Sequence, residues 1–155
     1  MTSIQAPVAV LQTGHVALNV SDLERSQPFY EQVFGLQEQR RGADPDKKWV
    51  FLGRGKQTIV TLFQQSSGEF RTDAPGLHHL SFQAESVEQV SAAERTVRSL
   101  GAPIFHDGLV AHMEGAGSGG LFFADPDGIR LEIFAPTGLE GSPAPSGQEP
   151  TCGFF

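Results

Sequence analysis

The chain has 155 residues, 39% of them hydrophobic and 19% charged, which is enough for one compact domain with a buried core. Its net charge is −7 and it has no basic run, which argues against nucleic acid or a membrane surface as the partner. The sequence shows neither the basic start and apolar run of a signal peptide nor an apolar stretch of the roughly 18 residues that a membrane span needs. A single cysteine, Cys152, excludes an internal disulfide and favours a reducing cytoplasm as the location.

The first half of the chain predicts a strand, a helix and three further strands. Residues 13–20 alternate between polar and apolar side chains, as a half-buried strand does. A helix is expected over residues 22–34 and is ended by Gly35. The strands that follow are predicted at residues 36–41, 48–52 and 57–64.

The second half repeats this order. A strand is predicted at residues 77–84, a helix at 86–99, and further strands at 103–110, 121–124 and 129–134. The repeat predicts an α+β fold of two βαβββ modules, at about residues 12–65 and 76–135, within one domain covering residues 1–135. Residues 136–155 are rich in Gly, Pro and Ser, which predicts a flexible tail.

His15 and His79 occupy equivalent positions at the first strand of each half. The alternation places both on the polar face of the strand, and Glu132 lies between Leu131 and Ile133, so it also points away from the apolar side. Two histidines and a carboxylate on strands are typical of a catalytic metal site with open positions. We therefore predict His15, His79 and Glu132 as ligands of a divalent metal, with Fe(II) favoured and Mn(II), Zn(II) or Ni(II) as alternatives. The competing interpretation is three ordinary polar strand residues.

Thr61 stands in the first half where Glu132 stands in the second. A threonine is a poor ligand for these metals, so the sequence offers three protein ligands rather than four. We expect Thr61 to face the same cavity without binding the metal.

Further candidates surround this set. His112 lies in a Gly-rich loop, residues 112–120, and is a candidate general acid or base. Trp49, Phe51 and Phe63 share the face of the proposed site and are predicted to line an apolar substrate pocket, although ordinary core aromatics would show the same pattern.

Four segments carry a resemblance to a known family: GHVALNVSDLE from residue 14, FYEQVFGL from residue 29, LHHLSF from residue 77, and FFADPDGIRLEIF from residue 122. They resemble the vicinal oxygen chelate superfamily, which includes glyoxalase I, extradiol dioxygenases, fosfomycin-resistance proteins and bleomycin-binding proteins. The resemblance implies two modules that form a cupped mixed sheet around one metal, with His15, His79 and Glu132 as ligands and Thr61 at the fourth position. It also implies a homodimer, since many members are dimers and some build the metal site across two chains.

The resemblance implies a small-molecule substrate and leaves three functions open. A dioxygenase-type reaction on a substrate that chelates through vicinal oxygens comes first, because those enzymes use the three-ligand set. Phe122, which we assign to the substrate pocket, stands where they have a tyrosine. A lyase or isomerase of the glyoxalase type is the alternative, although Thr61 departs from its usual fourth ligand. The third is a drug-binding protein without catalysis, of the bleomycin-resistance type.

Overall fold

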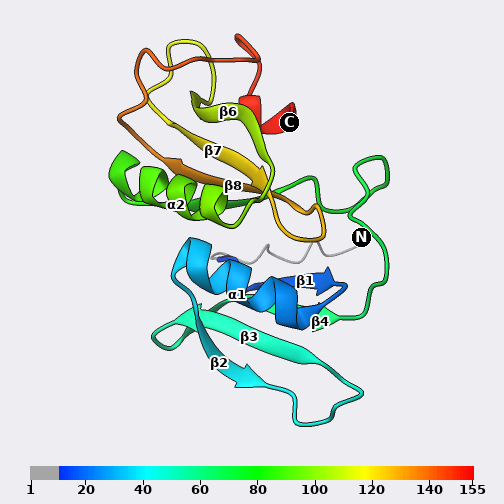
Figure 1. The fold of residues 1–155 in the computed structure, drawn as a ribbon. Helices are drawn as coiled ribbons and strands as arrows, with labels where there is room; N and C mark the ends of the chain where they lie inside the picture. The colour runs from blue at the N-terminus through cyan, green and yellow to red at the C-terminus, as the bar shows by residue number, and fades with distance from the viewer. Residues whose placement is uncertain (1–10) are drawn as a thin grey trace, which may run out of the picture.

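The computed structural model describes residues 11–155, so the part of the predicted domain before residue 11 lies outside the described residues. The first module consists of β1 (Val16–Val20), α1 (Leu23–Phe34), β2 (Gln37–Arg41), β3 (Trp49–Arg54) and β4 (Gln57–Gln64). The second consists of β5 (Leu80–Gln83), α2 (Val87–Ser99), β6 (Ile104–Ala111), β7 (Gly119–Ala124) and β8 (Arg130–Ala135). Each module forms its own four-stranded sheet, in the orders β1-β4-β3-β2 and β5-β8-β7-β6 (Figure 1). The α+β fold with tandem βαβββ modules is thereby confirmed.

The two sheets are built in the same way. The first strand of each module pairs in parallel with the last strand, and the remaining neighbours are antiparallel. Two parallel strands need a crossover connection, and in each module the helix that follows the first strand in the sequence belongs to this connection. Neither helix of residues 11–155 has the length and apolar character needed to span a membrane.

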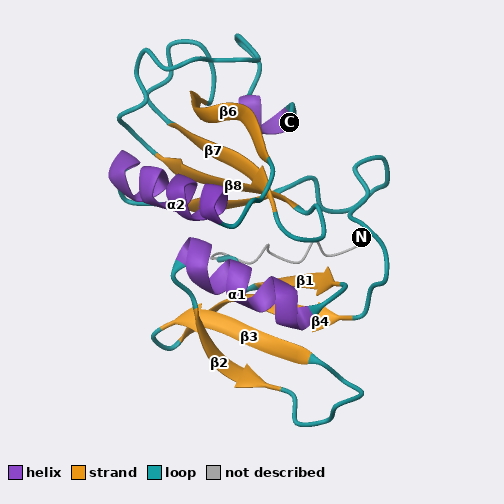
Figure 2. Cartoon of the chain, viewed as in Figure 1, coloured by secondary structure: helices purple, strands orange, loops and turns teal. Residues whose placement is uncertain are grey.

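The helices lie next to each other between the two sheets (Figure 2). The core that they share joins both modules: Phe34 of α1 packs on Phe82 of β5, with 4.2 Å between ring centroids, and on Phe123 of β7 at 5.9 Å. A polar contact also crosses between the modules, because the hydroxyl of Tyr30 donates a hydrogen bond to Asp125 at 2.9 Å. Each sheet therefore has an inner face on this core and an outer face turned away from the helices.

One strand begins earlier than the sequence predicts. β7 starts at Gly119, inside the predicted Gly-rich loop, and Gly119 and Gly120 pair with Ala135 and Phe134 of β8. A side chain at Gly120 would collide with the backbone carbonyl oxygen of Ile133. The glycines that suggest a loop are thus required by close approach of two strands.

The C-terminal segment, residues 136–155, returns across the second sheet and ends in a short 3-10 turn, Thr151–Gly153. The backbone N–H of Thr151 donates to the carbonyl of His112 at 2.7 Å, and its hydroxyl donates to the carbonyl of Ala111 at 2.8 Å. Leu139 and Thr151 are buried. This differs from the expected flexible tail, because β6 is an edge strand whose free backbone groups offer the segment hydrogen bonds that its composition does not reveal.

Candidate functional site

Glu132 lies on the outer face of the second sheet and is nevertheless only 2% exposed. It sits on β8 between Ser81 of β5 and Phe122 of β7, whereas its chain neighbours Leu131 and Ile133 belong to the core. A buried carboxylate is costly unless cations or hydrogen-bond donors surround it. The groups around Glu132 therefore define the candidate site.

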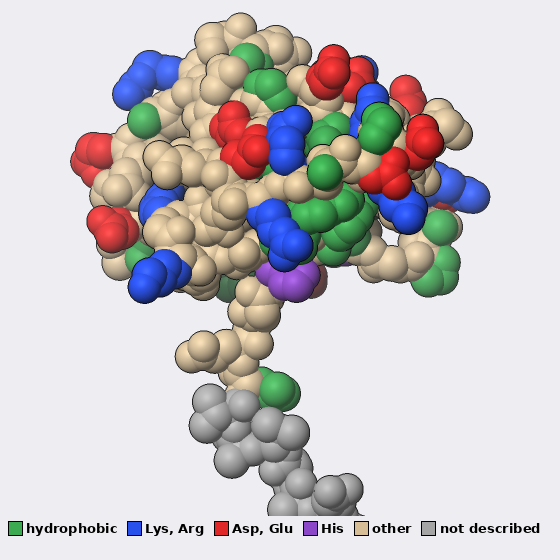
Figure 3. All heavy atoms as spheres, turned by 90° about the horizontal axis from the view of Figure 1, so that it is seen from below, with side chains coloured by type: hydrophobic (Ala, Val, Ile, Leu, Met, Phe, Trp, Pro, Cys, Tyr) green, Lys and Arg blue, Asp and Glu red, His purple; other side chains and the backbone are tan. Residues whose placement is uncertain are grey.

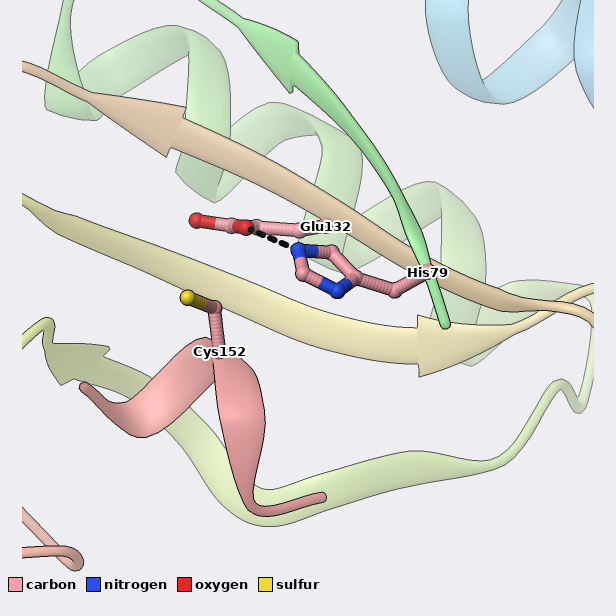
Figure 4. Close-up of side chains that lie close together, drawn as sticks. All are labelled: His79, Glu132 and Cys152. Carbon is pink, nitrogen blue, oxygen red and sulfur yellow. Dashed lines mark ion pairs between the residues drawn. The ribbon is translucent and has the colours of Figure 1, made fainter. Parts of the chain in front are cut away.

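Two imidazoles flank the carboxylate. Nε2 of His79 is 3.4 Å from one carboxylate oxygen of Glu132 (Figure 4), and Nε2 of His112 is 2.6 Å from the other. A carboxylate accepts hydrogen bonds, so the His112 Nε2–H donates to it, and Nδ1 of His112 faces the Ser118 hydroxyl at 2.9 Å. Nδ1 of His79 is 2.8 Å from Nδ1 of His78, which leaves the Nε2 atom of His79 directed at Glu132.

Cys152 completes a compact group with His79 and Glu132. One ligand atom from each of the three residues lies within 4.8 Å of the others, with Cys152 reaching the site from the 3-10 turn (Figure 4). Burial lowers the pKa of His79, despite the opposing effect of Glu132, and burial also raises the pKa of the Cys152 thiol, with the charge of Glu132 adding to the rise. Both changes in pKa follow mainly from the burial of this group.

Phe155 covers this group from the C-terminal side. Its ring centroid lies 5.1 Å from that of Phe122 and 5.5 Å from that of His79, and the guanidinium of Arg130 stands 5.4 Å from the ring. Phe122 is fully buried although it does not belong to the core cluster between the sheets. The C-terminal segment thus buries the outer face of the second sheet.

His15 lies at the outer face of the first sheet, one residue before β1. The His15 ring is exposed and stacks on Phe51, with 6.3 Å between centroids, and Trp49 packs on Phe51 at 5.0 Å. Phe63 pairs with Trp49 across the strands, and all three aromatic residues are partly exposed. Hydrophobic and histidine side chains lie side by side on the surface seen in Figure 3. The predicted pocket residues thus fall on both sheets: these three accompany His15, whereas Phe122 accompanies Glu132.

Thr61 lies on the same outer face of the first sheet. It pairs with Ala17 and Phe51, whereas the adjacent Val60 and Leu62 belong to the core. Among the described residues, its buried hydroxyl has no hydrogen-bond partner. The strand register is therefore the one that the alternation predicts.

One copy of the chain brings together only part of the predicted ligand set. His79 and Glu132 meet on the second sheet, and His112 and Cys152 join them, but His15 stands on the first sheet. The core and both helices separate the two outer faces. The sequence indicated His112 by its place in a Gly-rich loop. It did not indicate that Cys152 contacts the site, because the alternation of side chains in the repeat gives no information on the C-terminal segment, which lies outside the repeat.

A family model for the Glyoxalase/Bleomycin resistance protein/Dioxygenase superfamily matches residues 12–133, and the chain belongs to this superfamily. It is 30% identical to Lactoylglutathione lyase GLX1 of Arabidopsis thaliana over 143 residues, which are 89% of this chain and 46% of that protein. The chain thus spans about half the length of this relative.

Other relatives differ in named activity. A probable lactoylglutathione lyase of Vibrio cholerae is 28% identical over 82% of this chain and 95% of its own length. Catechol-2,3-dioxygenase of Bacillus subtilis is 27% identical over 87% of this chain and 44% of its own length. A solved glyoxylase/bleomycin resistance protein/dioxygenase domain from Frankia sp. EAN1pec is 25% identical, with a TM-score of 0.69 over 83% of this chain and 93% of that chain.

Proposed function

We propose that the chain is a metal-dependent enzyme that binds a small molecule through two neighbouring oxygen atoms. The observation that carries this proposal is the buried carboxylate of Glu132, whose two oxygens each face an imidazole. Nitrogen and carboxylate donors of this kind fit Fe(II), Mn(II), Zn(II) or Ni(II). An ion of this class, held by these residues, would supply Lewis-acid chemistry that polarises the substrate oxygens.

The protein groups have separate tasks in this proposal. His79 and Glu132 hold the ion, and His112 orients the carboxylate through the 2.6 Å hydrogen bond. The proton on Nε2 of His112 lies beside the carboxylate, where it is available to a substrate atom bound there. Ser118 keeps the His112 ring in place from its other nitrogen.

The third ligand, His15, is proposed to come from a second copy of the chain. His15 is exposed at the outer face of the first sheet, whereas His79 and Glu132 lie at the outer face of the second sheet, where Phe155 of the C-terminal segment packs against His79. In a symmetric homodimer, the first sheet of each copy would face the second sheet of the other. The three ligands would then meet at two equivalent sites. Thr61 and the aromatic residues around His15 would then line the same cavity as Phe122.

Dioxygenase-type cleavage of a catechol-like diol with Fe(II) is the first candidate reaction. His15, His79 and Glu132 would hold the ion through three positions, and the ion would then be able to take a chelating substrate together with O2. The similarity to a catechol-2,3-dioxygenase supports this choice.

A lyase or isomerase of the glyoxalase type is the second candidate. Phe122 offers no hydroxyl at the site, and the contact between His112 and Glu132 suits proton transfer without a change of redox state. The similarity to a probable lactoylglutathione lyase along 95% of that protein supports it. A binding protein without catalysis is the remaining alternative.

One set of measurements on anaerobically purified protein separates these functions. A stoichiometric metal followed by O2 consumption with a panel of catechols supports the dioxygenase. Isomerisation of a thiol adduct of a 2-oxoaldehyde without O2 consumption supports the lyase or isomerase. A metal-free protein that binds no added divalent ion would overturn the enzyme proposal.

A further inference from the structure

We infer that Cys152 is an additional metal ligand, which forms with His79 and Glu132 a complete three-ligand site within one copy of the chain. The inference rests on the proposed function only in assigning His79 and Glu132 to a metal. It adds a ligand from the C-terminal segment, and it selects a borderline-soft divalent ion of the zinc class, since thiolates favour such ions over harder ones.

The donor atoms already stand close to the spacing that one ion requires. Bonds of about 2.0–2.3 Å in a tetrahedral zinc site place the donors roughly 3.5 Å apart. The nitrogen of His79, a carboxylate oxygen of Glu132 and the sulfur of Cys152 all lie within 4.8 Å of one another. Side-chain movements on the order of 1 Å would bring the three donor atoms to that spacing, and the thiol proton would pass to solvent as the metal–sulfur bond forms.

The position of Cys152 is fixed independently of any ion. Thr151, its neighbour, is fully buried and holds the edge of the second sheet with two hydrogen bonds, to the carbonyls of Ala111 and His112. The side chain of the same His112 binds Glu132. His112 thus contacts both Thr151, which anchors the C-terminal segment, and the carboxylate of Glu132.

Phe155 covers the site formed by His79, Glu132 and Cys152. Its ring lies against those of His79 and Phe122 and under the Arg130 guanidinium. In the dimer proposed above, the first sheet of a second copy would occupy the face that this segment covers. The chain therefore has two alternative ligand sets that share His79 and Glu132: a closed set with Cys152, and the open set with His15 of a second copy.

Co(II) added to the reduced, full-length protein under anaerobic conditions tests the closed set directly. We expect a thiolate-to-Co(II) charge-transfer absorption in the near ultraviolet at one ion per chain. Cys152→Ser should abolish this band while circular dichroism shows an unchanged fold. Co(II) that binds without the band in the wild-type protein would overturn the inference and leave the proposed function intact, whereas no Co(II) binding at all would overturn both.

Alkylation of the thiol gives a second readout with a matched control. We expect Zn(II) to slow the reaction of Cys152 with iodoacetamide by at least about 10-fold, because a metal-bound thiolate is shielded from alkylation. Phe155→Ala should weaken this protection, whereas Phe154→Ala, which changes a ring that is 55% exposed in the same segment, should not. Equal alkylation rates with and without Zn(II) in the wild-type protein would contradict the inference.

Discussion

Glu132 is the residue on which the candidate site depends most, since its carboxylate contacts both histidines. Replacing it by Gln keeps the shape and removes the negative charge that balances a divalent ion. We expect Glu132→Gln to reduce metal affinity by at least about 10-fold, measured as metal content after dialysis. The matched control is Glu149→Gln at an exposed position of the C-terminal segment. Equal metal content in the two variants would remove Glu132 from the ligand set.

Asp125 makes folding stability depend on pH. Burial raises its pKa from 3.8 to about 6, although hydrogen bonds from Ile129, Tyr30 and Asp127 oppose the rise. Between these values the folded chain holds a proton that the unfolded chain releases, so this contribution to stability is present at low pH and is lost as the pH rises through about 6. Because a tenfold change in proton affinity is equivalent to about 1.4 kcal/mol, the loss of stability at pH 7 is at most about 3 kcal/mol.

Asp125→Asn should remove this dependence. An amide keeps an oxygen for the N–H groups of Asp127 and Ile129 and can donate to the hydroxyl of Tyr30, so the contacts survive without a charge to bury. Urea unfolding at pH 4.5 and pH 7 should show a smaller change for this variant than for the wild-type protein. Asp46→Asn, at an exposed position, should behave as the wild type. A variant that keeps the full pH dependence would show that another group causes it.

At the scale of elements, the two-residue alternation predicted the faces of the strands correctly. Thr61 and Glu132 both lie on outer faces, while their neighbours enter the core. The start of β7 was predicted wrongly, because its glycines suggested a loop. These glycines are needed for the close contact of β7 with the backbone of β8, which lies later in the chain. Composition alone cannot distinguish these two uses of glycine.

Gly120→Ala tests this interpretation of β7. The added methyl group would meet the backbone of β8 at Ile133 and Phe134, which cannot move aside as a flexible side chain would. We expect a loss of about 1–3 kcal/mol in the free energy of unfolding, seen as a lower Tm. Gly68→Ala is the control, because a Cβ there meets no atom within 4 Å. If both variants unfold at the wild-type temperature, the strands are less closely packed than described.

For the whole molecule, the sequence predicted two equivalent modules but not how their outer faces are placed. Periodicity assigns a side chain to a face of its own sheet, and it contains no information on the distance between sheets. Hence the sequence left open whether His15 and Glu132 meet within one chain or across two, and the helices and the shared core separate them in one copy. The sequence also did not predict that the C-terminal segment is ordered, because periodicity gives no information on its contact with the edge of the second sheet.

Mixing two inactive variants tests the assembly across copies. His15→Ala and Glu132→Gln should each bind metal poorly at the open site. If the site joins two copies, a mixed dimer contains one intact set, and random exchange of subunits restores about a quarter of the sites. Metal-dependent turnover should then reappear after the variants are unfolded and refolded together. No recovery, with dimers demonstrated by ultracentrifugation, would place the whole site within one chain or remove His15 from it.

The contact of Phe155 with His79 has a practical consequence for anyone who expresses this protein. A polyhistidine tag attached directly after Phe155 would place competing imidazoles near His79 and Glu132. Metal content measured on such a fusion would describe the tag as much as the protein. An affinity tag that is removed before metal analysis avoids this competition.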